Sequence, residues 1–288
     1  METNTKNTTE SDANMDALLN YYHGDQLPIS AWTDKYKQPG EITPTDMHVR
    51  LAKPFSRKIE ENNALPLFGD YETLSSYGKD GDKLNFGKIL SLFKDFKHIV
   101  PQGSIMSMLG SDKIGSLSNC FVVGQPADSY GGVLEKDQQL AQLMKRRGGV
   151  GIDISTLRPA GVPVTNAAGT SAGAVSFMDR FSNTTREVAQ NGRRGALMIT
   201  MDCRHPDVLD FVNVKKDKSR VTGANISVML RNDFMEAVKK DEDYILRFPC
   251  DQNTMFHTAK LADAPYNELI TIDGNQFRKV KAKEVYES

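Results

Sequence analysis

The sequence contains few cysteines, and they lie far apart. Cys120, Cys203 and Cys250 are the three cysteines among 288 residues. Zinc sites usually use closely spaced pairs, and secreted disulfide scaffolds contain many more cysteines. The pattern therefore favours a reducing, cytoplasmic location, where a cysteine is by default a small buried hydrophobic residue. For Cys120, which precedes an apolar run, the alternatives are a metal ligand, half of a disulfide and a reactive thiol.

The sequence also lacks long apolar runs, excess charge and paired histidines. No apolar run approaches the roughly 20 residues that span a bilayer, and the N-terminus has no apolar core of a signal peptide. The net charge of −1 gives no reason to expect a nucleic-acid or membrane partner. The five histidines are scattered, and none is four residues from another. We therefore expect no metal site and no Ser-His-Asp triad.

The first 97 residues differ in pattern from the rest of the chain. Residues 1–17 are polar and rich in Asn and Thr, which predicts a disordered tail. Residues 18–97 show helical spacing of apolar residues, for example at Ile89, Leu92 and Phe96, and predict a helical subdomain.

Residues 98–288 alternate between short β-rich runs and helical stretches. The runs predict strands at 120–124, 150–154, 196–201 and 224–230, with helices at 131–147, 172–190 and 233–240. Asp233 and Glu236 stand at capping-box spacing at the start of the last helix. This alternation indicates an α/β architecture with parallel strands. The last residues read as the opening of another helix, so we expect a fragment or a split protein.

Two glycine-rich segments carry clustered cations. "KRRGGVGID" (145–153) and "AQNGRRGALM" (189–198) each place arginines and glycines between a helix and a strand. Such segments suit a phosphate, but they also suit an ordinary capped helix end with solvated cations. Neither contains the G-x-G-x-x-G of a dinucleotide fingerprint.

Two further segments suggest a binding site. "GQPADSYGGVL" (124–134) places Asp128 and Ser129 just before a helix, where they suit either helix capping or a ribose or phosphate group. Residues 158–174 form a long Pro-, Gly- and Ala-rich segment, which is either a binding loop or a plain linker.

Seven motifs in a fixed order carry a family resemblance. They are "VPQGSIMSMLG", "SLSNCFVV", "DSYGG", "MKRRGGVGIDISTLRPAG", "SFMDRFSNTTREVAQNGRRGALMIT", "HPDVLDFV" and "TGANISV". From about residue 18 onward the chain resembles the catalytic large subunit of ribonucleotide reductase of the class I or class II type.

The resemblance implies both a fold and a reaction. The fold would be α/β: a helical N-terminal subdomain (18–97), followed in 98–288 by the first half of a ten-stranded α/β barrel. The family reduces ribonucleotides to 2′-deoxyribonucleotides by radical chemistry. A thiyl radical abstracts the 3′ hydrogen, and two other thiols supply the reducing equivalents.

Residue roles follow from matching the motifs by position. Cys120 matches the first thiol of the reducing pair, which protonates the leaving 2′-hydroxyl. Ser104, Asn119 and Gly149 match residues that line or pack against the substrate. The remaining matches belong to the allosteric effector site and its relay loop: Asp128, Ser129, Arg158, Gln190 and Arg194, with 158–170 as the effector loop and 190–196 as the second loop.

Other family features have no match in the sequence. The radical cysteine in its Asn-x-Cys-x-Glu setting, the second reducing cysteine and the regenerating cysteine pair are not found. Cys203 and Cys250 match none of these and are interpreted as structural. The N-terminal tail is too short for an ATP-cone domain.

The resemblance also implies partners. They are a C-terminal half of the large subunit, a second large subunit packed through helices 131–147 and 172–189, a thioredoxin- or glutaredoxin-type reductant, and dNTP or ATP effectors. The radical source would be a metal-containing small subunit or adenosylcobalamin, with no cofactor bound by this portion. The alternative is a non-catalytic, nucleotide-binding regulatory fragment that associates with an intact reductase.

Overall fold

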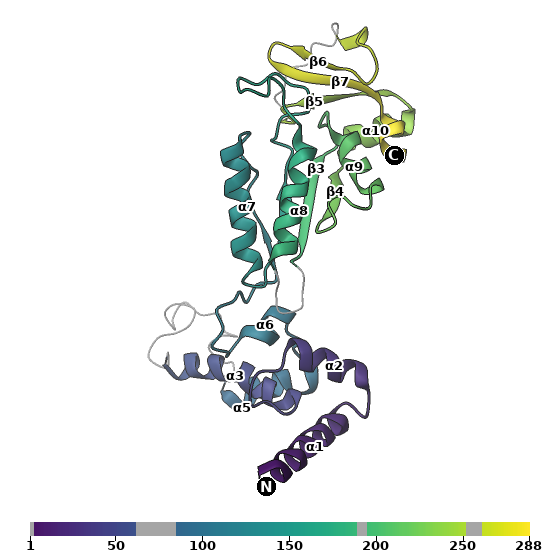
Figure 1. Cartoon of the computed structure of the whole chain (residues 1–288). Coiled ribbons are helices and arrows are strands. Elements are labelled where there is room, and N and C mark those ends of the chain that lie inside the picture. The colour runs from purple at the N-terminus through teal and green to yellow at the C-terminus, as the bar shows by residue number, and fades with distance from the viewer. Residues whose placement is uncertain (1–2, 62–84, 189–194, 252–260) are drawn as a thin grey trace, which may run out of the picture. The chain divides into compact units, whose positions relative to one another are not determined.

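The computed structural model describes residues 3–61, 85–188, 195–251 and 261–288. The chain divides into two compact units, Met1–Asn119 and Cys120–Ser288 (Figure 1). The sequence pattern placed the division after residue 97. The structure places it later because α6 and the segment that follows it belong with the helical unit.

The N-terminal unit is helical, as predicted. Its elements are α1 (Thr3–Tyr21), α2 (Gln26–Lys35), α3 (Pro44–Glu61), α5 (Phe86–Phe93), the 3-10 turn η2 (Lys94–Phe96) and α6 (Gly103–Met108). Helix α1 covers most of the segment for which we expected a disordered tail. Leu18 near its end is buried in the core of this unit, which gives the helix an apolar contact that the polar composition of 1–17 does not reveal.

The core of the helical unit follows from helical spacing. Met47 and Leu51 on α3 and Ile89 and Phe93 on α5 are each four residues apart, so each pair lies on one helix face. These side chains bury against Trp32 of α2.

Arg50 ties α3 to α6. Its Nε donates to Glu41 Oε1 at 2.6 Å, and its terminal nitrogens donate to the carbonyls of Met106 at 2.8 Å and Leu109 at 2.6 Å. The side chains of Arg50 and Glu41 are only 11% and 7% exposed. The pair therefore satisfies carbonyls near the end of α6 that have no partner within that helix.

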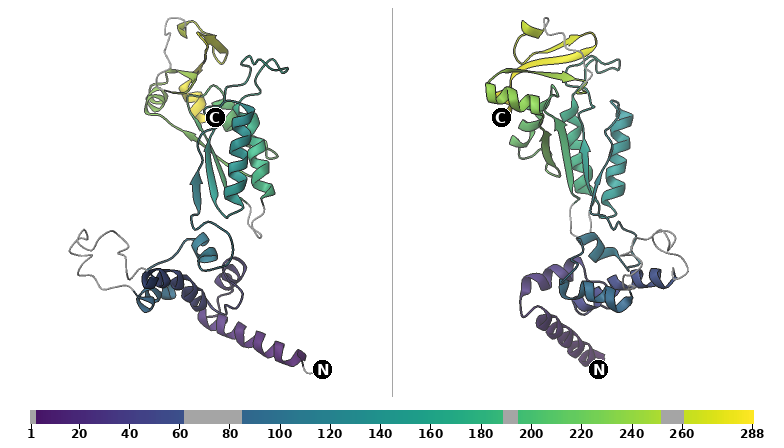
Figure 2. Two further views of the ribbon diagram at one scale, coloured as in Figure 1. Left: turned by 90° about the vertical axis from the view of Figure 1, so that its left-hand side faces the viewer. Right: turned by 180° about the vertical axis from the view of Figure 1, so that it is seen from behind.

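The C-terminal unit begins with a four-stranded parallel sheet. Its strands are β1 (Cys120–Val122), β2 (Gly149–Asp153), β3 (Leu197–Asp202) and β4 (Asn225–Met229), in that spatial order. All four were predicted from β-rich runs. Helix α7 (Tyr130–Met144) connects β1 to β2, and η3 (Ala174–Phe177) with α8 (Met178–Glu187) precedes β3. Helices α7 and α8 lie side by side on one face of the sheet (Figure 2).

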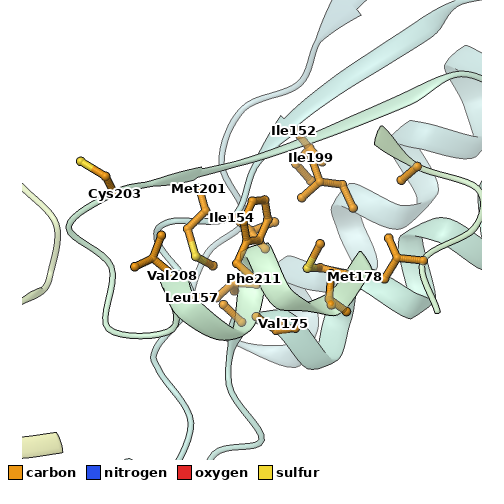
Figure 3. Packing of buried hydrophobic residues seen from close by; sticks show 14 of the residues in the cluster. Ile152, Ile154, Leu157, Val175, Met178, Ile199, Met201, Cys203, Val208 and Phe211 are labelled. Carbon is orange, nitrogen blue, oxygen red and sulfur yellow. The ribbon is translucent and has the colours of Figure 1, made fainter. Parts of the chain in front are cut away.

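Strand alternation produces two different sheet faces. Ile152 of β2 pairs with Ile199 of β3, and both side chains are buried. They pack with Met178 of α8 and Phe211 of α9 (Val208–Asn213), as Figure 3 shows. Because side chains alternate along a strand, the intervening residues point to the opposite face.

A second sheet, which the sequence pattern did not predict, follows the first. It is antiparallel, in the order β5 (Asp243–Phe248), β7 (Asn275–Lys281), β6 (Leu269–Ile272). The turn between β6 and β7 is Asp273-Gly274, and both residues have positive φ, as a type I′ hairpin requires. Helices α10 (Asn232–Lys240) and α12 (Ala282–Glu287) pack together, and α12 confirms the helix expected at the end of the sequence.

The predicted capping box of α10 is wrong. Arg231 occupies the N-cap position, and Asp233 lies inside the first turn. The Asp233 carboxylate accepts from Tyr244 Oη at 3.1 Å and thus links the helix to β5. A tertiary contact replaces the local one that the spacing suggested.

Candidate functional site

A cavity of about 300 Å³ opens where β1 leads into α7. Asp128, Ser129 and Arg158, which the family motifs assign to an effector site, all line it. Most residues between Val164 and Ala172, in the long Pro- and Gly-rich segment, line it as well. The structure therefore brings the three predicted residues and the predicted binding loop into one site.

An ion pair forms one wall of the cavity. Arg158 Nε donates to Asp128 Oδ2 at 2.8 Å, and the Arg158 backbone amide donates to Asp128 Oδ1 at 3.0 Å. The two side chains are 35% and 31% exposed. This geometry fixes the guanidinium at the rim while leaving part of it open to solvent, where it could bind an anion.

Ser129 is the N-cap of α7. Its Oγ accepts from the Gly132 amide at 3.0 Å, so the ordinary capping role predicted as one alternative is confirmed. Gly132 is required here because a Cβ at that position would lie 2.3 Å from the Ala127 carbonyl oxygen. The cap holds the helix start, with its partial positive charge, against the cavity.

Two aromatic residues line this cavity that the sequence motifs had not identified as site residues. Tyr130 and Phe177 both line it, with ring centroids 5.7 Å apart and planes at 82°. Tyr130 is 66% exposed, which leaves its ring open to a planar group such as a nucleobase. The tyrosine in "DSYGG" was the available signal.

The segment between Arg158 and Gly173 forms an irregular hairpin that contains the predicted effector loop (158–170) and three further residues. We keep the name effector loop for the whole hairpin, 158–173. Pro163 and Thr170 form an antiparallel bridge, and the Val164 amide donates to the Gly169 carbonyl at 2.9 Å. Residues 165–170 at its tip are exposed. The loop is thus an ordered cavity wall rather than a plain linker.

Cys120 lies on the sheet face opposite α7 and α8. It is the first residue of β1, pairs with Gly149 of β2, and is an exposed free thiol. The next outward-facing position pairs Val122 with Gly151 and Gly151 with Met198, whose side chain is 39% exposed. Glycines beside Cys120 leave room for a ligand to approach this edge of the sheet.

Ser104 and Asn119 belong to the helical unit and contact each other. The Ser104 amide donates to Asn119 Oδ1 at 2.9 Å, and Asn119 Nδ2 donates to Gln102 Oε1 at 2.5 Å. Cys120 and Gly149 are likewise paired within their own unit. Gln190 and Arg194 lie outside the described residues, as does most of the predicted second loop.

A second cavity, of about 430 Å³, lies at the carboxyl ends of the parallel strands. Asp202 at the end of β3 is buried there and accepts from Arg204 Nε and Arg231 Nε, both at 3.0 Å. Burial alone would raise the pKa of Asp202, but the hydrogen bonds from the two arginines lower it below its ordinary value.

The other two cysteines have the surroundings of structural residues. Cys203 is fully buried, and burial raises its pKa to about 11. Cys250 lines the second cavity, and burial raises its pKa as well. Both remain protonated thiols at neutral pH, whereas nucleophilic chemistry needs the thiolate.

The described residues contain neither a metal-binding cluster nor a membrane-spanning helix. No group of three or more His, Cys, Asp or Glu side chains among them could hold a metal ion. No helix in the described parts of the chain is long and apolar enough to cross a membrane.

Comparison with known proteins gives a consistent picture. The ribonucleotide reductase barrel domain matches residues 118–288. A vitamin B12-dependent ribonucleoside-diphosphate reductase of Thermoplasma acidophilum is 33% identical over 211 residues, which cover 72% of this chain and 26% of the relative. A protein of that name from Mycobacterium tuberculosis is 35% identical over 144 residues, covering 49% of this chain and 20% of the relative.

A eukaryotic relative matches as well. The ribonucleoside-diphosphate reductase large subunit of Caenorhabditis elegans is 30% identical over 141 residues, which cover 47% of this chain and 18% of the relative. The matched part of the chain thus spans about a quarter or less of the length of these relatives. Because the family match covers more than half of the chain and includes β1–β4 and the cavity beside α7, the chain belongs to the ribonucleotide reductase barrel-domain family.

Proposed function

We propose that these residues form the N-terminal portion of a ribonucleoside-diphosphate reductase catalytic subunit, which converts ribonucleotides to 2′-deoxyribonucleotides for DNA synthesis. The observation that carries the proposal is the exposed Cys120 thiol at the start of β1, beside Gly149, in the same unit as the effector cavity. The family's radical cysteine and the disulfide partner of Cys120 would be supplied by a C-terminal half that lies outside these 288 residues.

Cys120 would act as a reducing thiol. In the proposed reaction the 2′-hydroxyl leaves as water, a hydrogen replaces it, and two thiols become one disulfide, so that the two electrons balance. Its position on the exposed sheet face suits this role because both the substrate and a second thiol must reach it. Ser104, Asn119 and Gly149 would line the substrate.

The cavity beside α7 would bind a deoxynucleotide or ATP as allosteric effector. The Arg158 guanidinium and the helix start capped by Ser129 suit phosphate and ribose oxygens, and Tyr130 offers a ring to the base. Gln190 and Arg194 would relay the effector's identity to the substrate site. A second copy of the subunit would pack through α7 and α8.

The remaining partners rest on the family. A thioredoxin- or glutaredoxin-type protein would regenerate the thiols in the cytoplasm. The radical would come from a metal-containing small subunit or from adenosylcobalamin, and relatives named vitamin B12-dependent support the second source as much as the eukaryotic relatives support the first.

Reconstitution tests the proposal. The chain is combined with a C-terminal portion carrying Asn-x-Cys-x-Glu and a radical source, and deoxynucleotide formation is measured. We expect turnover that Cys120→Ser abolishes and Cys203→Ser retains. Turnover that survives Cys120→Ser would refute the assigned role.

One observation favours a second candidate function. The three residues assigned to the effector site, Asp128, Ser129 and Arg158, line one cavity, while the family's radical motif is not among the residues of this chain. A regulatory fragment that binds nucleotides and associates with an intact reductase would need only the cavity. Such a fragment would change the effector response of the intact enzyme, and Cys120→Ser would leave that change unaltered.

A further inference from the structure

The turn His205-Pro206-Asp207 contacts both ends of the effector loop. We propose that His205 and Asp207 are positioning residues of the effector cavity, which hold the two stems of the loop in place and so set the affinity and selectivity for nucleotides. The inference rests on the proposed effector function and adds to it two residues that line neither the cavity nor the sheet face around Cys120.

Asp207 does not do what its position suggests. It occupies the N-cap of α9, yet among the described residues its side chain caps no amide of that helix. Its carboxylate instead accepts from the Ala160 amide, at 3.1 and 3.2 Å for the two oxygens, and from the Ala174 amide at 3.1 Å. Ala160 lies in the first stem of the loop, and Ala174 directly follows the second. One buried carboxylate therefore fastens both stems.

His205 fixes the start of the first stem. Its Nε2 lies 2.8 Å from the Leu157 carbonyl oxygen, and its Nδ1 accepts from the Asp207 amide at 3.0 Å. The ring thus donates at Nε2 and accepts at Nδ1, which is the neutral form. Burial lowers the pKa of His205 and favours that form. Leu157 itself lines the effector cavity.

Close packing confirms how tightly the stems meet the turn. Gly173 has a φ of +85°, and a Cβ there would lie 2.7 Å from Asp207 Oδ2 and 2.8 Å from Ala160 Cβ. A residue with a side chain therefore cannot occupy this position without moving the carboxylate or the first stem. The two stems and the turn form one packed junction.

The fixed points flank the cavity walls. The first stem lines the cavity with Leu157 and Arg158, and the second stem lines it with Ser171 and Ala172. The backbone groups bonded to the turn are the Leu157 carbonyl and the amides of Ala160 and Ala174. The exposed tip of the loop, 165–170, has little packing to hold it. The bonds to the turn, together with the two hydrogen bonds from Arg158 to Asp128, therefore hold the loop in place relative to the start of α7. A site held ready in this way binds more tightly.

A variant set on the whole chain tests the proposal. Asp207→Ala removes both fastenings, and Asp207→Asn keeps one acceptor oxygen while turning an amide N–H₂ toward the other backbone donor. Asp210→Ala, on an exposed position of the same helix, is the matched control. Thermal unfolding establishes that each variant is folded. The measurements are amide exchange by mass spectrometry for peptides spanning 157–174 and dissociation constants for dTTP, dATP, dGTP and ATP.

We expect Asp207→Ala to accelerate exchange at the Ala160 and Ala174 amides. We also expect it to raise the dissociation constants about tenfold or more and to reduce their differences among the four nucleotides, because the loop must then be ordered on binding. Asp207→Asn should lie between, and Asp210→Ala should match the unmodified chain. A merely structural role would lower thermal stability without changing selectivity.

Two results would overturn the proposal: unchanged exchange at both stems in a folded Asp207→Ala chain, or unchanged nucleotide affinities despite faster exchange. An unmodified chain that binds none of the four nucleotides refutes the proposed effector function instead. The exchange measurement then still decides whether the turn positions the loop.

Discussion

The buried ion cluster at the end of β3 makes a quantitative prediction for Asp202→Asn. The change removes the negative charge that neutralises Arg204, whose side chain is 6% exposed and donates to Asp202 at 3.0 Å from both Nε and the terminal nitrogen. Leaving one partner of a buried pair uncompensated costs about 3–5 kcal/mol. Arg231, at 42% exposure, adds little because solvent screens its charge.

Cys203, the next residue, provides the assay. Its side chain is fully buried, so a thiol reagent reaches it only when this part of the sheet opens. Labelling of each cysteine is followed by peptide mass spectrometry, with the exposed Cys120 as internal control. A loss of about 3 kcal/mol corresponds to labelling of Cys203 that is at least about 100-fold faster.

A double variant and a pH series make the test specific. Asp202→Asn with Arg204→Met removes both charges and should recover most of the lost protection. Because the pKa of Asp202 is lowered in the folded state, its contribution is present above the ordinary value of 3.8 and is lost as the pH falls through the folded value. Cys203 labelling that changes less than about fivefold in Asp202→Asn would refute this reasoning.

Three further predictions concern other sites. Arg158→Ala should weaken dTTP and ATP binding about tenfold or more while the exposed control Lys240→Ala leaves it unchanged, as calorimetry would show; equal affinities would contradict the cavity assignment. Arg50→Met should destabilise the helical unit by about 3–5 kcal/mol, because the buried Glu41 carboxylate loses its counter-charge and keeps only the hydrogen bond from the Gln38 amide. Fluorescence of the single tryptophan, Trp32, during denaturation measures this loss, and a loss below about 1 kcal/mol would contradict the prediction. Burial lowers the pKa of His48 in the folded state, so the neutral imidazole contributes its full stability above the unfolded-state pKa of about 6.5. This stability is lost as the pH falls below that value, because the unfolded chain then binds a proton that the folded chain does not. His48→Phe should flatten this part of the pH profile of the unfolding transition seen by Trp32, and an unchanged slope would contradict the prediction.

The parallel sheet could be predicted from the sequence because its pattern is local. Val150 and Ile152 on β2, and Ile154 directly after it, alternate along the chain and bury one face under helices whose apolar residues recur at helical spacing. The antiparallel sheet was missed although Asp273-Gly274 is a strong hairpin signal, because β7 carries many charged residues and resembles a solvated segment.

Some site residues could be predicted from the sequence, and others could not. Asp128, Ser129 and Arg158 were predicted from motif order, and the structure places them around one cavity. Asp207 was not predicted, since a histidine-proline-aspartate turn at a helix start suggests a cap. Its actual partners, Ala160 and Ala174, are 47 and 33 positions away. Both donate through backbone amides, which nearly every residue has, so the residue types at these positions do not indicate the contact.

The most direct test of Cys120 as a reducing thiol is its redox state after a single turnover. The chain, its complementary portion and a radical source are given a ribonucleoside diphosphate without external reductant, and cysteines are then alkylated and mapped by mass spectrometry. We predict that deoxynucleotide forms and that Cys120 is protected in a disulfide while Cys203 remains a thiol. Deoxynucleotide formation with Cys120 still a free, alkylatable thiol would contradict it.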